Sequence, residues 1–276
     1  MAGVHRALEP RAGHVRTGAR FSLRLLRQFD LTDHLDRSIS LPSPAQRVLA
    51  FLAVHDCPLQ RAFVAGSLWP DSSEAKAYGS LRSALWRLSA AAPGAVVASP
   101  TMLQLGQGVS IDLIELLATT RELRSGGRVS RARRTSELAA QFEDELLTDW
   151  YDEWVAVWRE RWRQARLHAL EALARGLALA GEFDAAVECG LAAVVADPLR
   201  ETSHRVLIEI HLLEGNRSEA LREYDAFRAL LARELGLEPD RELTDLVRPL
   251  IDRTPSGDPV RRGRDEPVLT SVGSPH

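Results

Sequence analysis

The sequence predicts a mostly α-helical protein with a small β component, in which a mixed N-terminal domain precedes an all-helical domain. Two observations predict this class. Before Asp112, short apolar runs alternate with helix-starting and turn residues, whereas after Asp112 almost every stretch has the apolar spacing of a helix. In the second part, the hexapeptide at Gly181 is echoed at Gly215, 34 residues later, and 34 residues is the period of tetratricopeptide helix pairs.

The elements of the N-terminal domain are predicted from alternating apolar residues, helix caps and helix breakers. Ser43 is suited to cap a helix because its hydroxyl can accept a hydrogen bond from the first turn, and Pro70 and the Pro93-Gly94 pair end the next two helices. In chain order, the prediction is strands at 21–31 and 38–41, helices at 43–56, 61–69 and 71–91, and a hairpin built from 95–99, 102–105 and 109–112.

This order of strands, helix, helix, turn, helix and hairpin is typical of a winged helix-turn-helix domain, which we assign to residues 20–112. In that class the third helix enters the DNA major groove. On the predicted third helix, Leu81, Leu85 and Leu88 lie on one side and define the buried face. The opposite side carries Gly79 and the candidate DNA-binding residues Lys76, Arg82, Ser83, Trp86 and Arg87, and a further candidate, Ser80, lies at its shoulder.

These side chains suit DNA in different ways. Arg82 and Arg87 can bond guanine edges or phosphates, Lys76 and Ser80 lie where phosphates tend to be gripped, and Trp86 could pack on the sugar-phosphate backbone or on a thymine methyl. The alternative is that they form the solvated face of an ordinary amphipathic helix; the order of elements around them favours DNA contact. The charge of the N-terminal part also favours DNA contact. Residues 1–110 hold 12 Lys and Arg against 7 Asp and Glu, in a chain whose net charge is −3.

The second domain is predicted at residues 113–252. With Gly181 taken as the glycine between two helices, Ala186, Ala193 and Pro198 fall where the tetratricopeptide motif places small residues and a terminal proline. Before the repeats, Trp150, Trp154, Trp158 and Trp162 recur every fourth residue and would cover about 120° of one helix. A seam against the repeats or the N-terminal domain is the favoured interpretation, and a groove for a ligand or partner is the alternative.

No enzyme signature is present, so we expect no catalytic residue and no cofactor. The only lysine, Lys76, does not complete a phosphate-binding loop, and no His-Glu-x-x-His occurs. His204 and His211 lie seven residues apart without further ligands, so we expect no metal site.

Several stretches resemble the Streptomyces antibiotic regulatory protein (SARP) family. "LPSPAQRVLAFLAVH", "LWPDSSE", "LRSALWRLS" and "VSIDLIEL" look like its winged helix domain. "ELLTDWYDEWV", "ERWRQARLHALEALA" and the run from Tyr224 to Pro239 look like the bacterial transcriptional activator domain that follows it. The resemblance covers roughly residues 21–252.

The resemblance implies a transcriptional regulator, usually an activator, that binds direct repeats in promoter DNA and recruits RNA polymerase. Direct repeats would place two copies side by side, as a homodimer on DNA. By position, Ser80, Arg82, Trp86 and Arg87 inherit the DNA-contacting role. The loop that faces RNA polymerase falls on Asp71, Ser72, Ser73 and Glu74.

Two departures from the family keep a second function open. The predicted wing contains "TMLQL" without a basic residue, and Gly79 weakens the third helix by roughly 1 kcal/mol relative to alanine. The alternative is therefore a helical-repeat adaptor whose winged helix binds a protein. We also expect a cytoplasmic location without membrane contact, and disordered tails at 1–19 and 253–276.

Overall fold

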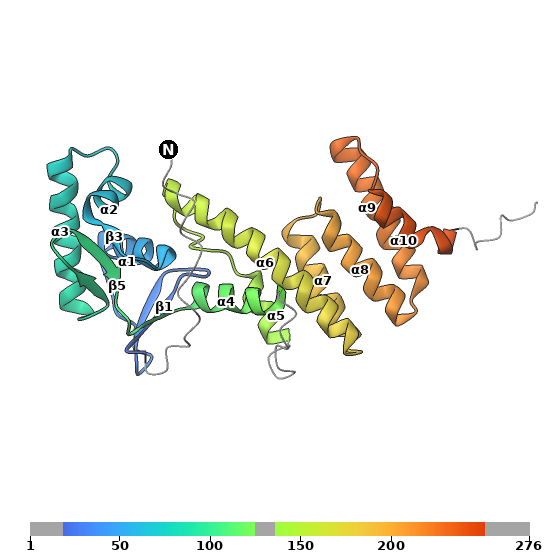
Figure 1. The fold of residues 1–276 in the computed structure, drawn as a ribbon, viewed down its shortest axis with the longest axis horizontal. Helices are drawn as coiled ribbons and strands as arrows, with labels where there is room; N and C mark the ends of the chain where they lie inside the picture. The colour runs from blue at the N-terminus through green and yellow to red at the C-terminus, as the bar shows by residue number, and fades with distance from the viewer. Residues whose placement is uncertain (1–18, 125–135, 252–276) are drawn as a thin grey trace, which may run out of the picture.

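The computed structural model describes residues 19–124 and 136–251 of the 276-residue chain. The two predicted tails lie outside this part of the chain, apart from Ala19. The winged helix elements form one end of the molecule, and the later helices follow one another away from it, so that the molecule is elongated (Figure 1). Among the described residues, no helix combines the length and apolarity needed to cross a membrane.

Nine described elements precede the helical part, in the predicted order except for the short strand β3 between the first two helices, which was not predicted. They are β1 (Phe21–Arg24), β2 (Asp30–Asp33), α1 (Ser43–His55), β3 (Leu59–Gln60), α2 (Arg61–Leu68), α3 (Glu74–Ala91), β4 (Val96–Ala98), β5 (Met102–Leu105) and β6 (Val109–Ile111).

The strands form two small sheets. In the first, β1 lies between β2, which is antiparallel to it, and β6, which is parallel to it. In the second, β5 lies between β3 and β4 and is antiparallel to both, with Leu103 opposite Leu59 and Leu105 opposite Val96. The β4–β5 hairpin is the wing of the winged helix. The prediction was wrong to include 109–112 in it, because β6 leaves the hairpin to pair with β1.

The strand predicted at 21–31 is also wrong as a single element. β1 ends at Arg24, the backbone turns at Arg27 with a positive φ of 67°, and the chain returns as β2 from Asp30. A partner far along the chain causes this break, since Leu26 forms an isolated bridge with Leu146. Residues 38–41 form no strand either; only Ser38 pairs, through an isolated bridge to Thr32.

The three helices of this part lie close to their predicted ranges, but the cap of the first one differs. Pro42, not Ser43, occupies the N-cap of α1, and no side chain caps it. The Pro42 carbonyl instead accepts hydrogen bonds from the backbone N–H groups of Ala45 and Gln46, at 2.8 and 3.1 Å. Ser43 therefore belongs to the first turn, followed at once by Pro44, which is tolerated there because no partner exists for its missing N–H.

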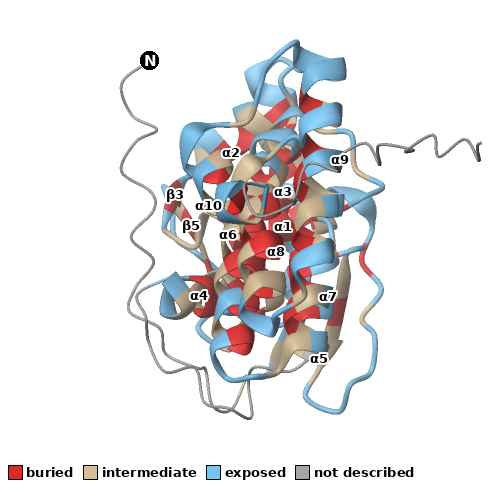
Figure 2. Cartoon of the chain, turned by 90° about the vertical axis from the view of Figure 1, so that its right-hand side faces the viewer, coloured by how far each residue is buried: buried red, intermediate tan, exposed pale blue. Residues whose placement is uncertain are grey.

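From Asp112 onward the described chain is helical, as predicted. The helices are α4 (Asp112–Arg124), α5 (Ser136–Glu143), α6 (Glu153–Leu179), α7 (Phe183–Ala196), α8 (Glu201–Glu214), α9 (Arg217–Leu235) and α10 (Arg241–Ile251). Successive helices from α6 to α10 pack on their neighbours in chain order. The buried residues, red in Figure 2, gather toward the middle of the view, and the exposed ones lie toward its outline.

The 34-residue repeat corresponds to the pairs α6–α7 and α8–α9. Gly181 lies in the turn between α6 and α7 with a φ of 79°, and Gly215 ends α8 with a φ of 86°. Both positions need the left-handed conformation that glycine adopts without strain. Inside the repeat, Gly190 of α7 lets Leu207 of α8 approach so closely that an added Cβ would lie 2.5 Å from its Cδ2 atom.

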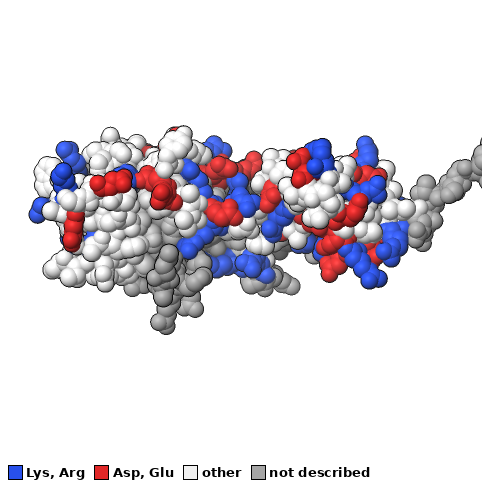
Figure 3. Space-filling view, turned by 90° about the horizontal axis from the view of Figure 1, so that it is seen from above, with Lys and Arg blue, Asp and Glu red and all other residues white. Residues whose placement is uncertain are grey.

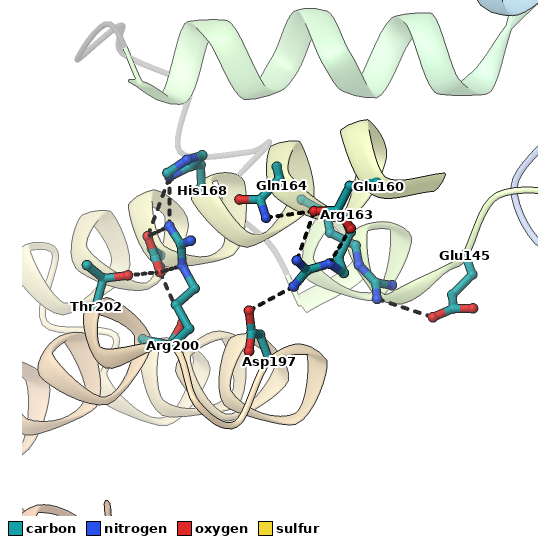
Figure 4. A network of polar contacts seen from close by, with 11 residues as sticks. Glu145, Glu160, Arg163, Gln164, His168, Asp197, Arg200 and Thr202 are labelled. Carbon is teal, nitrogen blue, oxygen red and sulfur yellow. Dashed lines mark hydrogen bonds and ion pairs between the residues drawn. The ribbon is translucent and has the colours of Figure 1, made fainter. Parts of the chain in front are cut away.

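A polar network ties α6 to the turn between α7 and α8 (Figure 4). The Glu171 carboxylate, almost fully buried, accepts hydrogen bonds from Arg200 (2.7 Å), Thr202 (2.8 Å) and Ser203 (3.0 Å). Burial alone would raise the pKa of Glu171, but these donors outweigh it and hold the pKa below its usual value. The carboxylate is therefore ionised, and its hydrogen bonds fix α6 relative to the start of α8.

A buried histidine, His204 of α8, holds the two helices of the second repeat together. The ring of His204 stacks on Phe227 of α9 at 4.1 Å between centroids. Its Nδ1 atom lies 2.6 Å from a Glu223 oxygen, and its Nε2 atom donates to the Pro198 carbonyl at 2.8 Å. The side chain thus packs α8 against α9 and against the preceding turn, which accounts for it in structural terms.

Candidate nucleic-acid interface

The third helix, α3, is held by its apolar side against α1 and α2. Ala77, Leu81, Ala84 and Leu88 are buried, whereas Leu85 is only half-buried. Two of the buried residues are alanines, so the helix can lie close to its neighbours. Packing on one side leaves the opposite side of all five turns free to meet another molecule.

Most of the candidate DNA-binding residues are exposed on that opposite side. Lys76, Arg82, Ser83, Trp86 and Arg87 are exposed, and Ser80 is half-buried at the flank. Trp86 has 69% of its surface exposed, which is unusual for so large an apolar side chain.

The basic residues of α3 differ from those of the repeats. Among the described residues, none forms an ion pair or side-chain hydrogen bond with Lys76, Arg82 or Arg87. In the repeats, by contrast, nine described arginines pair with carboxylates, as at Arg163–Glu160 within α6 and at Arg175–Glu209 between α6 and α8. Basic and acidic side chains accordingly lie side by side over the repeats (Figure 3). No described side chain therefore competes with a ligand for these three cations.

The wing receives a cation that the sequence analysis missed. Arg61, the first residue of α2, donates from its side-chain Nε atom to the Ser99 carbonyl at 2.8 Å, and its backbone N–H donates to the Thr101 carbonyl at 2.9 Å. Ser99 and Thr101 belong to the turn of the β4–β5 hairpin. The two remaining guanidinium nitrogens have no partner among the described residues, so a basic group lies at the wing although the hairpin itself contains none.

The loop predicted to face RNA polymerase lies between α2 and α3. Asp71, Ser72 and Ser73 are exposed there, and Glu74 is exposed in the first turn of α3. The loop begins at Trp69, whose ring lies 6.0 Å from the guanidinium carbon of Arg47 on α1. The negative charge of this loop is therefore presented beside, and not on, the basic face of α3.

The four tryptophans do not lie on one helix as predicted. Trp150 precedes α6, which begins only at Glu153, because Asp152 occupies the N-cap position in extended conformation. Its ring stacks on Phe29 at 6.0 Å. The other three are on α6: Trp154 meets Phe51 of α1 edge-on at 5.2 Å, Trp158 meets His55 at 5.3 Å, and Trp162 stacks on Phe142 at 6.0 Å.

Three of the four tryptophans therefore contact aromatic rings of the N-terminal part. Trp158 and Trp162 are buried, and Trp154 and Trp150 are half-buried. His55, which Trp158 covers, has its pKa lowered by burial, an effect that the nearby Arg161 reinforces. A neutral imidazole fits this apolar setting.

Backbone pairing strengthens the same junction. The chain at Asp144–Thr148 runs beside the end of β1, so that the Leu147 N–H donates to the Leu25 carbonyl at 2.9 Å and the Arg27 N–H donates to the Glu145 carbonyl at 2.7 Å. The Asp112 carboxylate accepts from the N–H groups of Leu25 and Leu26, both at 3.0 Å. These bonds fix the direction in which α3 points relative to the repeats.

Arg47 joins three elements at this junction. Its guanidinium donates to the Leu68 carbonyl at the end of α2 at 2.8 Å and to the Asp152 carboxylate at the start of α6. Both side chains of the ion pair are largely buried. The acidic loop, α1 and α6 are consequently held in one arrangement.

Comparisons with known proteins agree with this architecture. Residues 111–250, more than half of the chain, match the family described as the bacterial transcriptional activator domain. The solved structure of Mycobacterium tuberculosis EmbR in complex with a low affinity phosphopeptide superposes with a TM-score of 0.68 at 21% sequence identity. That alignment covers 86% of this chain and 66% of the EmbR chain, just under two thirds of that protein. The comparison with curated protein sequences gave no match.

Proposed function

Since this chain belongs to the bacterial transcriptional activator domain family, as a non-enzymatic transcriptional regulator of the SARP type, we propose that it binds promoter DNA through α3 and recruits RNA polymerase. The observation that carries the DNA-binding part is the outward side of α3. It combines three cations that have no ion-pair partner among the described residues with an exposed tryptophan, on the third helix of a winged helix fold.

The charge distribution supports DNA as the ligand of this surface. Lys76 and Arg87, which pair with no described carboxylate, can neutralise phosphates, and the release of condensed counterions then drives binding. Arg82 and Arg87 can also reach base edges, where a bidentate guanidinium contact with guanine gives sequence discrimination. In the repeats, by contrast, most of the described arginines are already paired with carboxylates.

Arg61 extends the proposed interface to the wing. A hairpin beside the recognition helix lies along the DNA backbone in winged helix proteins. With its Nε atom bonded to the Ser99 carbonyl, Arg61 keeps two guanidinium nitrogens beside the hairpin turn without a partner among the described residues. We assign it a phosphate contact, so its role is to add affinity without reading sequence.

The acidic loop is the element that we assign to RNA polymerase. Asp71 and Glu74 are exposed and carry no ion pair with any described residue. They lie beside the DNA-reading face, where a polymerase bound to the same promoter can reach them, and they repel the phosphate backbone. Arg47 anchors the loop to α6, so that the activator domain sets the orientation of both surfaces.

A salt titration tests DNA binding. The full chain is titrated with DNA from upstream of its own and neighbouring genes, and log affinity is expected to fall linearly with log salt, with a slope of about −0.9 per neutralised phosphate. The Arg82→Ala/Arg87→Ala variant should have a shallower slope. A matched control, Arg217→Ala/Arg228→Ala, removes the same charge from exposed positions of α9 and should keep the wild-type slope. Equal slopes for both variants would contradict the proposal.

Transcription in vitro tests the recruiting loop. Asp71→Asn/Glu74→Gln removes two charges and keeps the side-chain shapes, so DNA binding should persist while activation falls. Asp225→Asn/Glu238→Gln, which neutralises two exposed carboxylates of the repeat domain, serves as the control. Undiminished activation by the loop variant would reject this assignment and leave DNA binding intact.

A further inference from the structure

On the outward side of α3, the type of residue changes from the centre of the exposed face to its flanks. A helix turns by about 100° per residue, so the four buried residues of α3 give the mean direction that faces the protein core. Around the helix axis, the opposite, outward direction lies within about 30° of Ala75, Gly79, Trp86 and Ala90. Arg82 and Ser83 lie about 50° to either side of this line, and Arg87 lies about 90° away. The helix therefore presents small residues and one tryptophan along its centre, with cations at its flanks.

Position across a recognition helix decides which part of DNA a residue meets. A helix that lies in the major groove turns its outermost line toward the base edges, whereas residues at its flanks face the phosphate-lined walls. The flanking Arg87 can serve as a wall contact. Trp86 is the one large side chain on the central line, and no neighbour covers it, since 69% of its surface is exposed.

The small residues on this side allow the backbone of α3 to come close to the DNA. Gly79 lies two turns before Trp86 on the same line, and an added Cβ there would meet no atom within 4 Å in the protein. The backbone of α3 can therefore come near the floor of the groove at Gly79 and Ala75. Such an approach brings the indole ring of Trp86 onto the base edges.

The chemistry of the groove then selects the base. An indole is apolar apart from one N–H donor. The edges of guanine, adenine and cytosine present hydrogen-bonding groups and no alkyl group in the major groove, and the one methyl group there is the C5 methyl of thymine. An indole ring placed over polar base edges would cost those edges their hydrogen bonds to water. Placed over the thymine methyl, the ring instead buries apolar surface, which favours binding.

We propose that Trp86 is a specificity-determining residue that recognises the C5 methyl group of a thymine at a fixed position of the DNA site. This inference rests on the proposed DNA binding and adds the kind of base that the centre of α3 requires. A 5-methylcytosine presents the same methyl in the groove, so at that position it should be bound more tightly than an unmethylated cytosine.

The test uses the full chain and a duplex enriched by it from a random pool. Each thymine of the enriched site is replaced in turn by deoxyuridine, which removes one methyl and nothing else. Wild-type affinity should fall about four-fold at one position, as expected for about one buried methyl-sized group. Trp86→Ala should bind more weakly overall and show no further loss from uracil at that position. Arg87→Ala, the matched control, should keep the four-fold methyl effect.

The outcomes separate this inference from the proposed function. No enrichment of any sequence from the pool would reject DNA reading itself and the inference with it. Enrichment with uracil tolerated at every thymine would leave DNA reading standing and reject a methyl contact. A methyl effect that persists in Trp86→Ala would assign the contact to another residue. Because Trp86 is exposed, its replacement should leave the free energy of unfolding nearly unchanged, and a urea titration checks this.

Discussion

Replacing Gly79 by alanine should stabilise the protein and weaken its DNA binding. Glycine inside a helix costs about 0.5–1 kcal/mol relative to alanine, because the unfolded chain loses more backbone freedom on folding. At Gly79 the added methyl meets no atom within 4 Å, so no steric term offsets this gain. The free energy of unfolding should therefore rise by about 0.5–1 kcal/mol, the full propensity difference.

The effect on DNA binding has the opposite sign because of where the methyl points. Gly79 lies on the central outward line of α3, and a Cβ there would hold the helix away from the floor of the groove. We expect a loss of affinity for the enriched site of about 1–3 kcal/mol, the cost that an extra group causes at a closely packed contact.

Two measurements on the same samples check this pair of effects, urea unfolding and a DNA titration. Gly66→Ala is the matched control: Gly66 lies on the exposed side of α2, also with nothing within 4 Å of an added Cβ, and it should gain similar stability without any loss of affinity. Unchanged or tighter DNA binding by Gly79→Ala would refute the assigned direction of α3.

Three further predictions concern the helical part and its junction. Gly190→Ala should lower the free energy of unfolding by about 1–3 kcal/mol despite the better helix propensity, since the new Cβ would lie 2.5 Å from buried Leu207; urea unfolding measures this. Glu171 has a lowered pKa in the folded state, so its contribution to stability is present above its unfolded value of 4.5 and is lost as the pH falls; stability measured from pH 7 to pH 3 should decline less steeply for Glu171→Gln. Arg47→Ala should cost about 1.5–3 kcal/mol, because the Asp152 carboxylate and the Leu68 carbonyl lose a charged donor, and a value near zero in urea unfolding would refute a structural link there.

The helices and the class of fold could be predicted from the sequence because their signals are local. Apolar spacing and breakers such as Pro70 place α1, α2 and α3 near their predicted ranges, and Gly181 and Gly215 mark the turns of the repeat. Each signal reflects a backbone conformation or a buried face that neighbouring residues decide among themselves.

The errors lie where distant residues decide. The single strand predicted at 21–31 breaks at Arg27, since the Thr148 hydroxyl and N–H bond to its carbonyl from 121 residues away. The two-residue strand β3 is too short to leave a periodic pattern. Trp150 falls outside α6 because Arg47 of the other part of the chain binds Asp152 at the helix start.

The candidate interface shows the same division. Helical periodicity alone placed Arg82, Trp86 and Arg87 on one side of α3, and the structure exposes all three. Arg61 was missed because its relevance comes from a hydrogen bond to the hairpin turn 38 residues later. A basic residue at the start of a helix has no sequence signal that links it to a wing.

The most direct test of the account is the ratio of affinities for promoter DNA and for random DNA of equal length, at one salt concentration, for wild type and for Arg82→Ala/Arg87→Ala. The wild-type chain should prefer promoter DNA, and the variant should lose about 1–3 kcal/mol of that preference for each lost base contact, while it keeps its fold by urea unfolding. A wild-type chain without any preference, or a variant that retains all of it, would contradict the claim that α3 reads DNA sequence.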